Sequence, residues 1–156
     1  MDIVVKNAET YFGKDEKEEF QRYLNNLDED LKEAGYDEET KRDYRYTLVE
    51  YMKNYYAARA ISEKYNSLNS EYEKYANLYK NEPNDEKAKE YLKKANAIRN
   101  RQKVLKSIYE HFDSLVQSKQ PEVTEIGAKI DSRVKENNHD GRSETPSGPK
   151  YPTGRP

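Results

Sequence analysis

The chain has 156 residues, of which 33% are hydrophobic and 37% are charged, and its net charge is -2. This is too little apolar material for a thick globular core, but it suffices for long helices that each bury one stripe. The 15 tyrosines argue against full disorder, and the absence of cysteine excludes disulfides, thiol nucleophiles and cysteine-ligated zinc.

The first part of the chain predicts a short N-terminal arm, residues 1–14, followed by a helix over about residues 15–34. Asp15 is the expected N-cap, because Glu18 follows three residues later as in a capping box. Gly35 is placed to end this helix in the left-handed conformation. The apolar stripe of the helix consists of Phe20, Leu24, Leu27, Leu31 and Ala34.

Between Tyr36 and Gln120 there is no glycine, and Pro83 is the only proline. Without these breakers the segment predicts long helices, the first over about residues 37–80 with Asp37 as its N-cap. A sevenfold repeat favours coiled-coil packing along it, through Tyr44, Tyr51, Ala58, Tyr65, Tyr72 and Tyr79. A second apolar row predicts that the first helix packs on this one, at Val49, Met52, Tyr56 and Ala60.

The segment around Pro83 predicts a chain reversal, and residues 85–118 predict a third long helix. Because the connection is short, the two long helices are expected to be antiparallel neighbours. Pro121 suits the first turn of a fourth helix over residues 121–136, and the Pro/Gly-rich residues 137–156 predict an extended tail.

The predicted fold is therefore all-α, with one helical domain over residues 15–136. We expect a long antiparallel, coiled-coil-like helical hairpin that projects as a two-helix arm. Two shorter helices should pack at its open end, next to the extended C-terminal tail.

Charge is distributed unevenly along this chain. Residues 1–43 hold 14 acidic and 7 basic side chains, and residues 83–120 hold 9 basic and 5 acidic ones. We expect these segments to complement each other by lying side by side. The alternative is a phosphate-binding surface, because five cations share one sector of the third helix. We call Lys89, Lys93, Arg99, Lys103 and Lys106 the basic stripe.

Nothing in the sequence predicts catalysis. There is no Gly-rich phosphate loop and no HExxH motif, and the only histidines are His111 and His139. We therefore expect no catalytic residue, cofactor or metal. The apolar run at Ile3–Val5 is too short for a signal peptide or a membrane span, so the expected location is the cytoplasm or an assembled particle, with no membrane partner.

Tyrosine is enriched where proteins meet partners, and four tyrosines are the predicted partner contacts: Tyr72, Tyr75, Tyr79 and Tyr151. The leading hypothesis is a non-catalytic assembly or adaptor protein that binds proteins, or a second copy of itself, through its arm and tail. A scaffolding component of a phage-like particle fits this shape. The alternatives are a nucleic-acid-associated protein that uses the basic stripe and a small regulatory protein that masks a partner surface.

Overall fold

The computed structural model describes residues 3–137, and all regular structure in that part of the chain is helical. A short 3-10 helix, η1 (Ala8–Tyr11), precedes three α-helices. These are α1 (Lys14–Ala34), α2 (Glu38–Asn81) and α3 (Asp85–Asn137). The predicted all-α class is confirmed, with three α-helices in place of the expected four.

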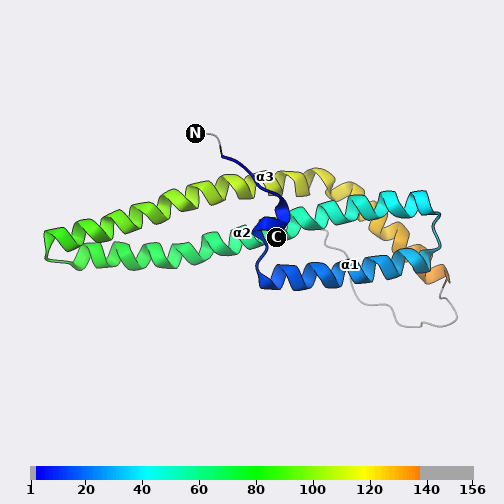
Figure 1. Ribbon diagram of the computed structural model, residues 1–156, viewed down its shortest axis with the longest axis horizontal. Helices are drawn as coiled ribbons and strands as arrows, with labels where there is room; N and C mark the ends of the chain where they lie inside the picture. Colours follow the sequence, from blue (N-terminus) through cyan, green and yellow to red (C-terminus); the bar gives the residue numbers. More distant parts are fainter. Residues whose placement is uncertain (1–2, 138–156) are drawn as a thin grey trace.

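Two of these helices form the long axis of the molecule (Figure 1). α2 and α3 lie side by side and run in opposite directions, because residues 82–84 connect them directly. α1 runs along the first half of α2 and contacts both long helices, while η1 packs on α2. No helix in residues 3–137 combines the length and apolar character that crossing a bilayer requires.

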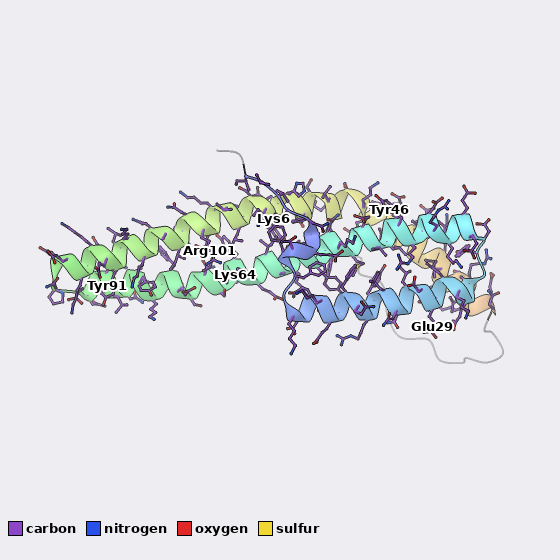
Figure 2. All side chains as sticks on the ribbon, in the orientation of Figure 1. Lys6, Glu29, Tyr46, Lys64, Tyr91 and Arg101 are labelled. Carbon is purple, nitrogen blue, oxygen red and sulfur yellow. The ribbon has the colours of Figure 1, made fainter. Side chains whose placement is uncertain are left out.

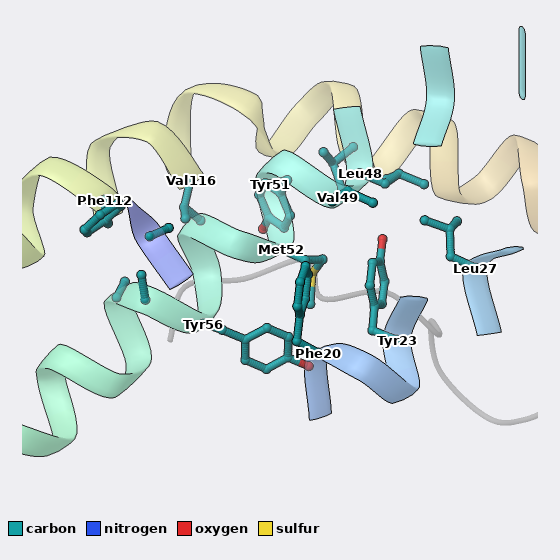
Figure 3. Packing of buried hydrophobic residues seen from close by; sticks show 14 of the residues in the cluster. Phe20, Tyr23, Leu27, Leu48, Val49, Tyr51, Met52, Tyr56, Phe112 and Val116 are labelled. Atoms are coloured by element: carbon teal, nitrogen blue, oxygen red, sulfur yellow. The ribbon is translucent and has the colours of Figure 1, made fainter. Parts of the chain in front are cut away.

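The main core lies where three helices meet (Figure 3). Side chains from α1, such as Phe20 and Leu27, face those of α2, such as Met52, and α3 closes the core with Val116. Phe20 and Tyr56 pack edge to face, with their ring centroids 6.1 Å apart. α1 thus covers the side of α2 where the second apolar row predicts a neighbour.

The main core ends at Ile61 in α2 and begins again at Ile108 in α3. We call the segment between them, residues 62–107, the distal arm. It extends past α1 as two helices and their connection (Figure 1). Its buried residues are Leu68, Ala95 and Gln102.

The start of α1 differs from the prediction. The helix begins at Lys14 with Gly13 as its N-cap, and Glu16 rather than Glu18 reaches back, its Oε1 accepting a hydrogen bond of 2.8 Å from the Gly13 amide. Glu16 is only 3% exposed because Arg59 of α2 binds its carboxylate. A contact from another helix therefore decided which glutamate caps α1, and Asp15 is left exposed.

The break predicted at Pro121 is also absent. α3 is 53 residues long and continues through this proline without interruption. A proline inside a helix removes one backbone hydrogen bond and crowds the preceding turn, which bends a helix without always ending it. Pro121 is exposed, so water can solvate the carbonyl that loses its donor. Val123 and Ile126 are buried just beyond it and hold the rest of α3 on the core. Figure 1 shows α3 changing direction in this yellow part of the ribbon.

The other helix ends follow the local sequence signals. Gly35 terminates α1 with a left-handed φ of 71°. Asp37 caps α2, its Oδ1 accepting a 2.7 Å hydrogen bond from the Thr40 amide. The residue that the sequence assigned to the tail, Asn137, is the last residue of α3, and its amide donates to the carbonyls of Glu33 and Ala34. The rest of the predicted tail lies outside the described residues.

Candidate functional site

The distal arm contains a buried polar layer. Gln102 is 2% exposed, and its amide donates to the Tyr65 carbonyl at 3.1 Å and to Asn69 Oδ1 at 2.7 Å. Its carbonyl accepts from Arg99 Nη1 at 2.8 Å. A buried amide is costly unless it is hydrogen-bonded, so these bonds favour one alignment of α2 against α3.

One member of the basic stripe is held by this layer. The guanidinium of Arg99 lies 3.6 Å from the centroid of the Tyr72 ring, while one of its nitrogens donates to Gln102. Cation–π contact and the hydrogen bond together fix the side chain on the arm surface. A predicted phosphate-binding residue and a predicted partner contact therefore touch each other.

A second predicted partner contact, Tyr75, also lies in the seam between the two helices. Its ring is 6.4 Å from that of Tyr91 on α3, and the Lys94 ammonium lies 5.4 Å from its centroid. Both tyrosines are half-buried. Tyr72 and Tyr75 thus help join α2 to α3. The surface of each ring that a partner could contact is therefore smaller.

Apolar side chains are exposed near the tip of the distal arm. Tyr79, the third predicted contact, is 41% exposed, and Leu78 and Leu92 are 37% and 38% exposed. The fourth predicted contact, Tyr151, lies outside the described residues.

The basic stripe is exposed along its whole length. In residues 3–137, none of its five cations forms an ion pair within 4.0 Å. On a helical wheel the positions between them carry Asn96, Asn100 and Ser107, all exposed. Between Lys89 and Lys106 this sector of α3 therefore has hydrogen-bond donors and positive charge and no carboxylate, while Asp85 and Glu110 lie in it about one turn beyond its two ends.

The acidic N-terminal segment pairs with α2 instead. Asp28 binds Arg45 at 2.6 Å, and Glu9 binds Lys53 at 3.3 Å. Glu16 and Glu19 both bind Arg59, which also stacks on Tyr56. Figure 2 places Glu29 on α1 at the other half of the molecule from Arg101 and Tyr91 on the arm. In residues 3–137, no ion pair joins this acidic segment to residues 83–120, although the two segments touch where the Tyr11 ring packs on Phe112 with 5.6 Å between the centroids. The expected charge complementarity between them is therefore not seen, and the acidic side chains pair with α2.

The hollows on the surface are open grooves. One lies between α1 and α2, and its lining includes the apolar Phe20, Leu24 and Val49 and the cationic Arg45 and Lys53. Within residues 3–137, no group of three or more His, Asp or Glu side chains comes together in a way that could hold a metal ion.

Two residues in these networks were not singled out from the sequence. Gln102 occupies a sevenfold position after Ala88 and Ala95, where an apolar residue is expected, and this mismatch is a usable signal for a buried polar layer. Arg59 leaves no such signal, because its partners in α1 are about 40 residues away.

No protein-family model, curated protein or solved structure matches this chain.

Proposed function

We propose that this protein is a non-catalytic helical assembly or adaptor protein that docks into a larger complex through the distal arm and the C-terminal tail. In this proposal the arm acts as a coiled-coil-like hairpin, with its tip as the contact surface. The proposed setting is a phage-like particle, in which this protein is a structural component.

The observation that carries the proposal is the exposed apolar tip. Leu78 and Tyr79 lie in the last turn of α2, beyond the reach of α1 and beyond Leu68, which is the last buried residue of α2. Aromatic and aliphatic side chains that a partner can bury supply most of the binding energy in protein interfaces. An extended arm can deliver this small surface into a partner's groove.

The test compares protein capture by the intact chain, by a double variant of the tip and by a single control variant. Leu78→Ser/Tyr79→Ser removes apolar surface at the tip, and Tyr46→Ser removes a tyrosine that is 69% exposed at the other half of α2. Immobilised proteins are incubated with lysate of the producing cells, and captured proteins are quantified by mass spectrometry. We expect the tip variant to lose partners that the Tyr46 variant keeps.

Equal capture by both variants would exclude the tip as the contact surface. Far-ultraviolet circular dichroism of each variant checks that helicity is unchanged, so that lost capture reports a lost contact. Deleting residues 138–156 tests the tail in the same assay, including the predicted contact Tyr151.

Nucleic-acid association is the second candidate function. A specific observation favours it: the basic stripe forms no ion pair in residues 3–137, and the acidic segment that could neutralise it pairs with α2. Unpaired lysines and arginines on one face are the usual electrostatic footprint of phosphate binding.

A further inference from the structure

We propose that the basic stripe binds the phosphate backbone of duplex nucleic acid, without reading the base sequence, and that Arg99 is its pre-ordered contact. The proposal rests on the second candidate function and specifies its ligand. It is independent of whether the apolar tip binds a protein.

The stripe is continuous enough for several phosphates. From Lys89 to Lys106 it covers 17 helical steps, about 26 Å at a rise of about 1.5 Å per residue. That length matches about eight base pairs of B-form duplex at about 3.4 Å per pair. Five cations over this length, with Asn96 and Asn100 between them, can contact phosphates along one or both strands.

Arg99 is the ordered part of this surface. Most lysines of the stripe must lose rotamer freedom when they bind, but the Arg99 guanidinium is already fixed on Tyr72 and by Gln102. Its hydrogen bond to Gln102 is made by Nη1, which leaves other N–H donors of the planar group for a phosphate. Pre-ordering lowers the entropic cost of forming the contact.

The same surface fits other anionic partners less well. Binding to a membrane surface needs a broad apolar face, and a protein interface needs buried anchors, whereas Leu92 is the one large apolar side chain in this sector of α3. Single strands are gripped by exposed aromatic rings that stack on bases. The nearest ring, that of Tyr72, is half-buried and covered by Arg99.

The geometry also argues against base reading. The major groove of B-form DNA is about 12 Å wide and admits one helix. α2 packs along the whole arm portion of α3, so only the outer face of α3 can approach the duplex (Figure 1). Four of the five stripe cations on that face are lysines, which bind phosphates as point charges. The stripe would therefore follow the backbone from outside, and affinity should depend on charge and salt rather than on sequence.

The experiment measures fluorescence anisotropy of a labelled duplex DNA of about 20 base pairs, long enough to cover the stripe, with the full chain. Lys93→Glu/Lys103→Glu reverses two exposed cations of the stripe. Lys87→Glu/Arg101→Glu makes the same charge change on the opposite side of α3, where both side chains are also exposed. Circular dichroism confirms that both proteins stay folded.

We expect wild-type affinity to fall with salt at a logarithmic slope of about -4 to -5, given five phosphate contacts. The stripe variant should lose at least about tenfold in affinity and about two units of slope, and the opposite-side variant should change by less than about threefold. Arg99→Lys should weaken binding although it keeps the charge, because lysine cannot keep both the stacking and the forked hydrogen bonds.

Three outcomes would overturn the proposal: equal losses in the two double variants, absence of duplex binding at about 50 mM salt, or tighter binding to a single strand or to anionic phosphatidylserine vesicles than to the duplex. A duplex of unrelated sequence must bind equally well. The tip variant Leu78→Ser/Tyr79→Ser should retain duplex binding, so that failure of protein docking and failure of phosphate binding are distinguished.

Discussion

At the scale of single residues, the tyrosines of this chain perform different tasks according to their depth. Tyr23, Tyr51 and Tyr56 belong to the main core and are at most 8% exposed. Tyr72 and Tyr75 join the two helices of the distal arm and hold cations against their rings. Tyr46 is 69% exposed. One residue type thus fills a core, joins helices and lies on the surface.

Burial raises the pKa of the Tyr23, Tyr51 and Tyr56 hydroxyls above the ordinary tyrosine value of 10.0. In the unfolded chain these groups ionise near pH 10, so the unfolded state releases protons more readily than the folded state. Below this pH the contribution of these tyrosines to stability is complete. Above it, we expect the free energy of unfolding to fall as pH rises.

Urea unfolding at several pH values between about 8 and 11.5 measures this effect, with absorbance at about 295 nm reporting tyrosinate. Tyr23→Phe should reduce the alkaline loss of stability, and Tyr46→Phe should leave it unchanged. Ionisation of all tyrosines near pH 10 with full helicity retained would contradict the prediction.

At the scale of elements, α3 is the helix in which local and tertiary preferences conflict. Pro121 disfavours a continuous helix, while Val116, Val123, Ile126 and Ile130 are all buried against the core. Burial of a large aliphatic side chain contributes about 1.5 to 3 kcal/mol, so several of them outweigh one interior proline at about 3 kcal/mol. Tertiary packing therefore carries the helix through the proline.

Replacing Pro121 by alanine should stabilise the protein. The change restores a backbone donor and removes the clash with the preceding turn, partly offset by a more flexible unfolded chain. We expect a gain of about 1 to 2 kcal/mol, which raises the melting temperature by about 2 to 8 °C in a chain of this size.

Pro83→Ala is the matched control, because Pro83 lies in the exposed connection between α2 and α3. Here the loss of proline should lower stability slightly, by at most about 1 kcal/mol. A lower melting temperature for Pro121→Ala would mean that the bend is needed to seat the last part of α3 on α1.

At the scale of the whole molecule, the fold separates a three-helix base from a two-helix arm. α1 is the third helix of the base. The carbonyls at the C-terminal end of α1 accept hydrogen bonds from Asn137 at the end of α3. Arg133 adds a contact with the Tyr36 ring at 4.5 Å. The base is thus closed by residues that are about 100 positions apart in the sequence.

Truncation at this closure should have two distinct results. Deleting residues 138–156 should leave helicity and melting temperature nearly unchanged, because the contacts of Asn137 remain. Deleting residues 137–156 should lower stability by about 1 kcal/mol, since the carbonyls of Glu33 and Ala34 lose their donor. Thermal denaturation of both truncations measures this, and unfolding of the shorter deletion would show that residues 138–156 belong to the core.

Local signals in the sequence were sufficient wherever a few neighbouring residues decide the backbone. Gly35 and Asp37 mark helix ends because one residue adopts the left-handed conformation and the other accepts an amide hydrogen bond nearby. The absence of glycine between Tyr36 and Gln120 predicted long helices, because glycine interrupts a helix through its own local backbone freedom. The class of fold and most helix boundaries followed from such signals.

Only the tertiary structure decided the features that depend on distant residues. Arg59 selected Glu16 as the residue that caps α1, core contacts carried α3 through Pro121, and the position of α1 separated the acidic segment from the basic stripe. In the candidate site, the sequence named Tyr72 and Arg99 for different roles, and the structure brought them into contact. Their contact depends on the alignment of two antiparallel helices, which side chains of both helices fix together and which neither helix specifies alone.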